Sequence, residues 1–199
     1  MMRRTIALTL GALLLGFGGA QPNYTTSAQT ASGWTTLFDG TTLKGWNVVG
    51  DANWEVAEGA VQATRGMGGF LVTPAAYGDF QLTVEFWVSD DANSGVFIRC
   101  ADPKTITAAN SYEVNIYDRR PDPAYRTGAI VDVAKPMSTI NAGGRWNTFD
   151  ITAQGPKLLV TLNGTRTVEV EHKGHVRGPI ALQYGAGTVK FRNVRIRTL

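Results

Sequence analysis

Short runs of alternating apolar and polar residues dominate the chain from about residue 33 onward. In the clearest run, 80–88 (FQLTVEFWV), every second residue is apolar, and the residues between them are Gln, Thr, Glu and Trp. A period of two is that of a half-buried β-strand, and helical periodicity is nearly absent. Turn signals containing Gly, Pro or Asn separate the runs about every ten residues. The pattern predicts an all-β sandwich or jelly roll.

The predicted strands, in chain order, are 34–38, 54–56, 60–63, 70–73, 80–88, 95–100, 111–117, 127–133, 146–153, 157–162, 165–171, 180–184 and 188–197. Gln154-Gly155-Pro156 should form the turn between two of them. Asn163-Gly164 is a strong signal for a two-residue hairpin turn. The strands 146–153, 157–162 and 165–171 are therefore expected to follow one another as antiparallel hairpins.

The first 32 residues have a different character. Arg3 and Arg4 precede an apolar run (5–17) and the small residues Gly18-Gly19-Ala20. This is the pattern of a secretory signal peptide over 1–20, and the run is short for a membrane span. A Ser/Thr/Gln-rich stretch, 21–32, reads as a flexible leader. We expect an exported protein, periplasmic or extracellular, with one folded domain over 33–199 and no membrane span after signal cleavage.

Composition narrows the choice of partner and of chemistry. The chain has 19 Lys+Arg against 16 Asp+Glu, and without Arg3 and Arg4 the net charge falls to about +1, so nucleic acid is not an expected partner. The single cysteine, Cys100, excludes an internal disulfide. It alternates with Val96 and Ile98, which indicates a buried small hydrophobe rather than a catalytic thiol.

Three consecutive predicted strands place polar and aromatic side chains on the face opposite the core. If these strands form a meander, they share one face that has carboxylates, amides, a guanidinium and aromatic rings but no lysine. Its members, with one from 180–184, are Glu85, Trp87, Phe97, Arg99, Glu113, Asn115, Tyr117 and Gln183. Aromatic faces stack on the C–H side of a pyranose, while the polar groups hydrogen-bond to vicinal hydroxyls. We therefore expect this face to bind a sugar.

The alternative for this face is a Glu–Arg–Glu network that stiffens a half-buried sheet. In a meander, a strand spacing of about 4.8 Å would place the backbones of Glu85 and Glu113 roughly 10 Å apart, with Arg99 between them. A retaining glycosidase needs its two carboxyl groups about 5–5.5 Å apart, so that mechanism is disfavoured, whereas an inverting spacing stays open.

Two further groups of residues contain side chains that can bind metals. The oxygen-rich turn 90–95 (DDANSG) has residues of the kind that bind Ca²⁺, but an Asx-type hairpin turn explains it better. His172 and His175 are too few for a zinc site and read as surface residues. No metal ligands are assigned, and a divalent metal cofactor is left open.

Several segments, in their order and spacing, carry a family resemblance. They are 37–40 (LFDG), 43–46 (LKGW), 77–80 (YGDF), 84–86 (VEF), 93–99 (NSGVFIR), 112–116 (YEVNI) with Asp118, 146–148 (WNT), 178–183 (GPIALQ) and 191–196 (FRNVRI). The chain resembles the 3-keto-disaccharide hydrolase family, also described as a 3-keto-glucoside lyase/hydratase domain, over residues 33–199. The resemblance implies a concanavalin A-like jelly roll of two antiparallel sheets and cleavage of glycosides already oxidised at C3.

The resemblance also implies a base, a group that stabilises an enolate and groups that orient the sugar. Glu85 and Glu113 are the candidate bases, and Arg99 is the candidate for the enolate. The expected substrate-binding residues are Trp87, Phe97, Asn115, Tyr117, Asp118 and Gln183. Many members have a His shortly after the Gln that matches Gln183, whereas this chain continues with 184–187 (YGAG).

Three functions follow from these observations. The first is an exported enzyme that eliminates the C1 substituent of a 3-keto-glycoside and then hydrates the product. The alternative is a non-catalytic carbohydrate-binding module that uses the same face. The third is a structural or protein-binding sandwich, against which tight binding of any sugar would count.

Overall fold

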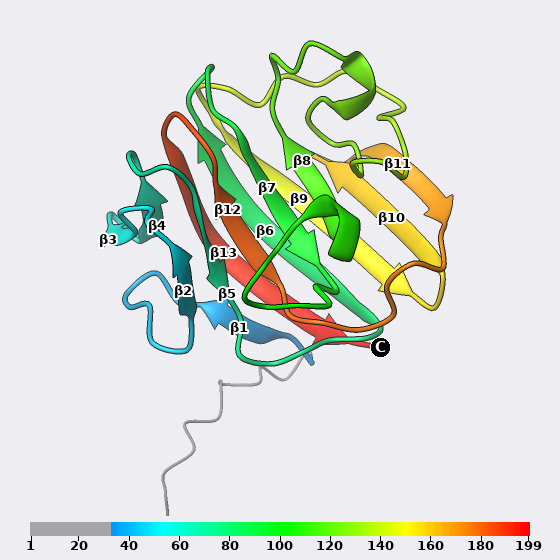
Figure 1. Ribbon diagram of the computed structural model, residues 1–199, viewed down its shortest axis with the longest axis horizontal. Coiled ribbons are helices and arrows are strands. Elements are labelled where there is room, and N and C mark those ends of the chain that lie inside the picture. The colour runs from blue at the N-terminus through cyan, green and yellow to red at the C-terminus, as the bar shows by residue number, and fades with distance from the viewer. Residues whose placement is uncertain (1–32) are drawn as a thin grey trace, which may run out of the picture.

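The structure is a computed structural model that describes residues 33–199. The predicted signal peptide (1–20) and flexible leader (21–32) lie outside the described residues. The described part folds into two antiparallel sheets with only two short helical turns (Figure 1). The predicted all-β class is thus confirmed. Within residues 33–199, no helix is long and apolar enough to cross a membrane.

The larger sheet has eight strands. In spatial order they are β11 (Thr165–Glu171), β10 (Lys157–Leu162), β9 (Trp146–Gln154), β6 (Phe80–Val88), β13 (Val189–Thr198), β4 (Ala60–Ala63) and β3 (Glu55–Ala57), with β1 (Thr35–Phe38) also paired to β13. The smaller sheet has five: β2 (Asn47–Gly50), β5 (Gly69–Val72), β12 (Ala181–Tyr184), β7 (Ser94–Ile98) and β8 (Tyr112–Ile116). The short helices η1 (Ala108–Asn110) and η2 (Pro123–Tyr125) lie in the loops before and after β8.

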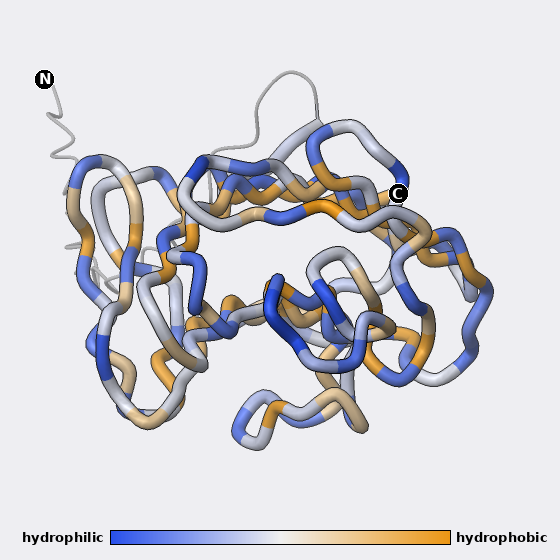
Figure 2. Tube along the Cα trace, turned by 90° about the horizontal axis from the view of Figure 1, so that it is seen from above, coloured by the Kyte–Doolittle hydropathy of each residue, from blue (hydrophilic) through white to orange (hydrophobic). Residues whose placement is uncertain are grey.

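The core lies between the two sheets, and the alternation in the sequence explains why. Along β6, the apolar members of the alternation are all buried and the residues between them are half-buried. Figure 2 shows the sheets as two layers, with hydrophobic and hydrophilic residues alternating along the chain. Phe86 of β6 stacks on Phe149 of β9 with ring centroids 4.8 Å apart. Apolar side chains of both sheets fill the space between the layers.

Most predicted strands agree with the structure, and two segments differ. β2 was missed because its run is short and two of its four residues are polar or glycine. The predicted strand 127–133 is an irregular segment, since Gly128 and Asp132 adopt left-handed backbone angles (φ 89° and 60°) that break an extended chain. Its backbone still bonds to β8 at Glu113 and Asn115, so it covers that edge of the sheet.

The predicted meander of three adjacent strands is wrong. β6 lies between β9 and β13 in the eight-stranded sheet, while β7 lies between β12 and β8 in the five-stranded sheet. The chain therefore changes layers between Val88 and Ser94. Two consecutive strands can bury their apolar faces equally well whether they are neighbours in one sheet or lie in opposite sheets of the sandwich. Alternation alone therefore does not distinguish the two arrangements. Glu85 and Trp87 consequently face the opposite side of the molecule from Phe97.

Candidate functional site

The outer face of the five-stranded sheet, which points away from the core, brings together several predicted site residues. Glu113 of β8 lies beside Phe97 of β7, its cross-strand partner. Gln183 of β12 lies beside Phe70 of β5. Asn115 lies two residues along β8 from Glu113, and therefore on the same face. We call these residues the front face: Phe70, Phe97, Glu113, Asn115 and Gln183.

Glu113 is the titratable group of the front face. Its side chain is half-buried, and burial raises its pKa from 4.5 to about 7, against a smaller lowering effect of the Arg120 charge. The Asp132 carboxylate acts in the same direction as burial. Within residues 33–199 the Glu113 carboxylate has no ion pair. A carboxyl group with a pKa near neutrality can both accept and return a proton at physiological pH, as a general acid–base catalyst must.

Aromatic rings cover the front face next to Glu113. Phe70 and Phe97 meet edge to face, with ring centroids 5.3 Å apart and an interplanar angle of 89°. Gly95 makes room for this arrangement, because a Cβ there would lie 3.2 Å from Cε2 of Phe97 and 3.4 Å from Cγ of Glu113. The missing side chain lets the buried Phe97 ring and the Glu113 stem lie close over the β7 backbone. Phe70 is half-buried, so it is the ring of this pair that a sugar could contact.

Two side-chain oxygens on the front face are buried and have no hydrogen-bond partner among residues 33–199. They are Oδ1 of Asn115 and Oε1 of Gln183. Asn115 is held in place because its Nδ2 donates to the carbonyl oxygen of Tyr125. A buried acceptor without a partner is unfavourable by about 1–3 kcal/mol. Gln183 is half-buried, so a ligand hydroxyl that donates to its oxygen would recover that energy, whereas Asn115 is fully buried.

The loop after β8 adds charged and aromatic groups around Glu113. The Arg120 guanidinium lies 5.8 Å from the ring centroid of Tyr117 and 5.7 Å from that of Tyr125. A hydrogen bond with Asp132 raises the pKa of Tyr125, and the negative charge of Asp132 adds to that effect. Asp132 also has a left-handed φ of 60°, which is uncommon for a residue other than glycine and is often found at functional sites.

Two of the predicted site residues lie on the other sheet. Glu85 and Trp87 of β6 point outward from the eight-stranded sheet. Burial acts to raise the pKa of Glu85, but hydrogen bonds from Arg192 (2.7 Å) and Asn193 (2.7 Å) and the Arg192 charge hold it below its ordinary value. Glu85 is thus an ionised partner of an arginine, and it cannot form a catalytic pair with a carboxylate on the front face.

Arg99 is also absent from the front face. It follows β7 and has a left-handed φ of 53°. The regular alternation of side chains along the strand therefore ends at this residue, and its side chain does not point to the front face. The guanidinium is buried, pairs with Asp79 at 3.0 Å and donates to the carbonyl oxygens of Gly78, Gly155 and His175 at 2.8–3.1 Å. These bonds occupy its donors, so Arg99 joins three segments of the fold and is not free to stabilise an enolate.

The same turn at Arg99 changes the surroundings of Cys100. Cys100 is buried, as predicted, but it does not join Val96 and Ile98 in the main core. It packs in a small cluster on the outer side of the five-stranded sheet, beside the front face, with Val72, Phe97, Ile106 and Ala181. Burial raises the pKa of its thiol to about 12. The thiol is therefore protonated at neutral pH and unsuited to nucleophilic attack.

Asp118 follows β8 and mainly organises a loop. Its Oδ2 accepts hydrogen bonds from the backbone N–H groups of Ala142 (2.7 Å) and Gly143 (2.9 Å), and its Oδ1 accepts one from the Thr127 hydroxyl. A cavity of about 430 Å³ lies beside it rather than over Glu113. The charged and polar residues around this cavity are Asp90, Asp118, Arg119, Arg126 and Asn141.

Side chains that could ligate a metal are scattered over the described part of the chain. Among residues 33–199, no three or more His, Cys, Asp or Glu side chains come together in a way that could hold a metal ion. In the oxygen-rich turn, Asp91 accepts a hydrogen bond from the Ser89 hydroxyl at 2.6 Å. His172 lies beside the Tyr112 hydroxyl, with its Nδ1 3.0 Å away. The divalent cofactor left open by the sequence has no cluster of ligands here.

Comparison with known proteins places the chain in a family. A family model described as a 3-keto-alpha-glucoside-1,2-lyase-like domain matches residues 33–197. A 3-keto-disaccharide hydrolase from Bacteroides thetaiotaomicron is 33% identical over 79 residues. That match covers 34% of this chain and 27% of the relative, so the chain spans about a quarter of the relative's length.

Solved structures with a similar fold also include carbohydrate-active proteins. Two from Parabacteroides distasonis, each described as a candidate glycosyl hydrolase, have TM-scores of 0.76 and 0.71 and identities of 19% and 26%. They cover 87% and 83% of this chain and 99% of their own chains. The carbohydrate-binding module CBM66 from Bacillus subtilis follows with a TM-score of 0.63 and 16% identity, covering 77% of this chain and 96% of its own. The predicted jelly-roll sandwich is confirmed.

Proposed function

Because the chain belongs to the 3-keto-alpha-glucoside-1,2-lyase-like family, we propose that it cleaves glycosides oxidised at C3 and that Glu113 moves the proton at C2. The observation that carries the proposal is the environment of Glu113. A carboxyl group with a pKa of about 7 lies half-buried beside an aromatic surface and two partnerless side-chain oxygens. The half-buried Phe70 ring suits the C–H face of a pyranose, and the Gln183 oxygen suits one of its hydroxyl groups.

The reaction follows from the acidity that a C3 ketone gives to the proton at C2. The Glu113 carboxylate takes that proton, the C2–H electron pair forms an enolate onto O3, and the enolate then collapses to expel the C1 oxygen substituent. The leaving oxygen takes up a proton, so the products are an unsaturated 3-keto sugar and an alcohol. Water then adds across the double bond, with its oxygen to C1 and a proton to C2, and the net change is hydrolysis.

Arg120 takes the role in this proposal that the sequence suggested for Arg99. It is the cation whose charge acts on Glu113, and the rings of Tyr117 and Tyr125 hold it in the loop after β8. A guanidinium near the base favours the negative charge that develops on O3 as the proton leaves C2. Gln183 would accept a hydrogen bond from a sugar hydroxyl through its partnerless oxygen, whereas Asn115 is fully buried and holds the backbone at Tyr125.

Turnover of a 3-keto-glucoside by the purified protein and two variants tests the proposal. Glu113→Gln should lower kcat about 10²–10⁴-fold, the usual contribution of general acid–base catalysis. Glu85→Gln is the matched control, because that glutamate lies on the other sheet, and its kcat should stay within about threefold of the wild type. Undiminished turnover by Glu113→Gln would refute the assignment.

The same experiment separates an enzyme from a binding module. Binding of the 3-keto-glucoside without turnover, with or without added divalent metal, would favour a carbohydrate-binding module that uses the front face. Loss of binding in Phe70→Ala would then place the ligand on that face, since Phe70 supplies part of its aromatic surface. Absence of both binding and turnover would reject the two functions proposed for the front face with this oxidised sugar.

Export from the cytoplasm is part of the proposal. It is supported by the two arginines, the apolar run and the small residues at the start of the sequence. Mass spectrometry of the protein recovered from the periplasm or medium should give a chain that begins near Gln21. Recovery of the intact chain in the cytoplasmic fraction would contradict export.

A further inference from the structure

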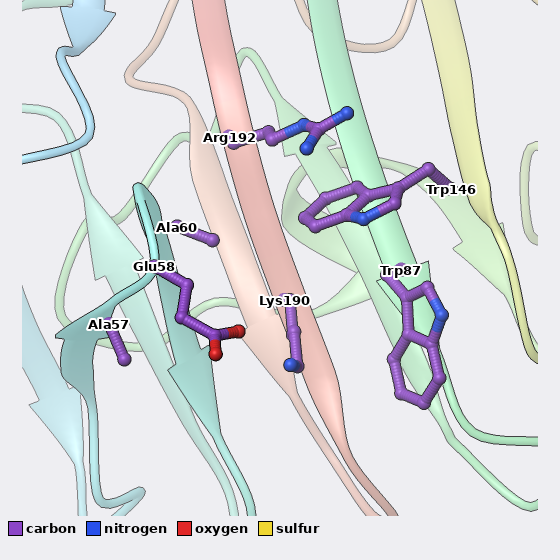
Figure 3. A pocket seen from close by; sticks show the side chains of 7 residues that line it. All are labelled: Ala57, Glu58, Ala60, Trp87, Trp146, Lys190 and Arg192. Carbon is purple, nitrogen blue, oxygen red and sulfur yellow. The ribbon is translucent and has the colours of Figure 1, made fainter.

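A second cavity lies on the outer surface of the eight-stranded sheet, away from the front face. Its volume is about 180 Å³, and two tryptophans, two basic residues, a glutamate and two alanines line it (Figure 3). We call it the tryptophan pocket and define it by Glu58, Trp87, Trp146, Lys190 and Arg192. Trp87, which the sequence assigned to a sugar-binding face, lies here, and the proposed reaction on the other sheet does not use it.

Three adjacent strands supply the pocket's central side chains. Trp146 of β9 is the cross-strand partner of Trp87 of β6, and Trp87 is in turn the partner of Lys190 of β13. Side chains that are paired across antiparallel strands point to the same face, so these three form a row across the sheet. All three are half-buried. The two rings thus lie side by side on a rigid support rather than on loops.

Basic residues hold the two rings in place. The Arg192 guanidinium carbon lies 3.9 Å from the centroid of Trp146, and Arg192 is itself bonded to Glu85 at 2.7 Å. In Figure 3, Arg192 lies on one side of the Trp146 ring, and Trp87 and Lys190 lie on the other. The Lys190 ammonium lies 5.5 Å from the Trp87 centroid. The rings are therefore ordered before any ligand arrives, which reduces the entropy lost on binding.

Glu58 lies on the opposite rim of the pocket in an unusual backbone conformation. It and Gly59 form the two-residue turn between β3 and β4, with φ angles of 53° and 75°. Turns of this kind favour Asn, Asp or Gly at the first position, and a glutamate there is unfavourable. Figure 3 shows its carboxylate pointing toward the Lys190 side of the pocket. A residue in a strained conformation that presents a functional group to a cavity suggests a role in binding.

The chemistry of the pocket favours a neutral ligand with many hydroxyl groups. Arg192 is neutralised by Glu85, and the positive charge of Lys190 is matched by the carboxylate of Glu58. Lys190 forms no ion pair within residues 33–199, so its ammonium is available to donate hydrogen bonds, and Glu58 can accept them. A hydroxyl group both donates and accepts, and the C–H face of a pyranose packs on an aromatic ring.

We propose that the tryptophan pocket is a second carbohydrate-binding site, which takes one neutral, unoxidised pyranose unit of a glycan. Its volume is smaller than that of sites for drug-sized ligands, about 300–1,000 Å³, and accords with a single sugar ring. The pocket and the front face lie on opposite sheets, so one glycan chain can be held at the pocket while the front face stays accessible. This inference does not depend on the reaction proposed for Glu113.

Titration of the purified protein with neutral oligosaccharides tests the second site. Cellohexaose, maltohexaose and mannohexaose are added separately, and the indole N–H signals are followed by two-dimensional NMR. At least one should shift the signals of Trp87 and Trp146. Either Trp87→Ala or Trp146→Ala should weaken binding of that sugar about fivefold, since the loss of one aromatic contact is worth about 1 kcal/mol.

Two control variants make the outcome specific. Trp34→Ala removes a tryptophan stacked by Arg195 and Arg197 near the far end of β13, roughly 20 Å from Lys190, and should leave binding unchanged. Phe70→Ala alters the front face and should also leave binding of the neutral sugar unchanged. Conversely, Trp87→Ala should still turn over a 3-keto-glucoside, because Trp87 lies on the other sheet.

Three results would overturn the proposal. One is the absence of any binding by the three neutral sugars. The second is binding that Phe70→Ala abolishes and the two tryptophan variants do not affect, because the sugar would then occupy the front face. The third is binding of an acidic oligogalacturonate alone, because the ligand would then be an anion and not a neutral sugar.

Discussion

Replacing Glu113 with Gln should stabilise the fold at pH 8 while it removes the proposed base. The pKa of Glu113 is raised to about 7, chiefly by burial, so the folded protein binds this proton more tightly than the unfolded chain, whose value is near 4.5. Between these values the folded state binds more protons, and stability falls as pH rises. A pKa difference of about 2.5 corresponds to about 3 kcal/mol, and partial exposure of the side chain reduces this to about 2 kcal/mol.

Urea denaturation of wild type and Glu113→Gln at pH 5 and pH 8 measures this effect. The variant should be more stable than wild type by about 2 kcal/mol at pH 8, with less than half of that gain at pH 5. Groups that titrate equally in both proteins, such as His175, cancel in the comparison. Glu85→Gln is the control of opposite sign, because the pKa of Glu85 is lowered and its charge is bonded to Arg192. Equal stability of Glu113→Gln and wild type at pH 8 would refute the reasoning.

Three other variants or reagents test separate parts of the structure. Arg99→Met should lose about 3 kcal/mol in urea denaturation because it removes the hydrogen bonds of a buried guanidinium to three backbone carbonyl oxygens and its ion pair with Asp79. A loss below about 1 kcal/mol would contradict this. Cys100 should not react with a chromogenic disulfide reagent in the native protein and should react fully in urea, as measured by the absorbance that the reaction releases. Rapid labelling of the native protein would show that the thiol is accessible. Gly95→Ala should raise KM for a 3-keto-glucoside about fivefold with little change in Tm, because the added Cβ would crowd Phe97 and Glu113. An unchanged KM would contradict this, because it would show that the two side chains move away from the Cβ without affecting the site.

The strands could be predicted because their signals are local. Phe80–Val88, Lys157–Leu162 and Thr165–Glu171 coincide with the predicted ranges, since a period of two and a turn signal at the end define each one. The Asn163-Gly164 turn has both residues in the left-handed region, as its sequence predicts. The sheet to which each strand belongs depends on contacts between distant segments, and alternation does not contain that information.

The candidate site was predicted in part for the same reason. Phe97, Glu113, Asn115 and Gln183 share a face because their strands were read correctly and belong to one sheet. The sequence did not identify three residues of the site because they lie outside the strands, where the direction of a side chain does not follow from a regular period. They are Arg120, Tyr125 and Asp132. The dense polar and aromatic composition of 119–126 (RRPDPAYR) was the available signal, since functional residues concentrate in such loops.

The contacts of Arg99 also bear on the order of events in folding. Its guanidinium bonds to Gly78, Gly155 and His175, which lie 21, 56 and 76 residues away along the chain. All three segments must be in place before the side chain is fully bonded, and such long-range contacts form late. A substitution of Arg99 is therefore expected to speed unfolding much more than it slows refolding. This one side chain would then govern how long the native sandwich persists rather than how quickly it forms.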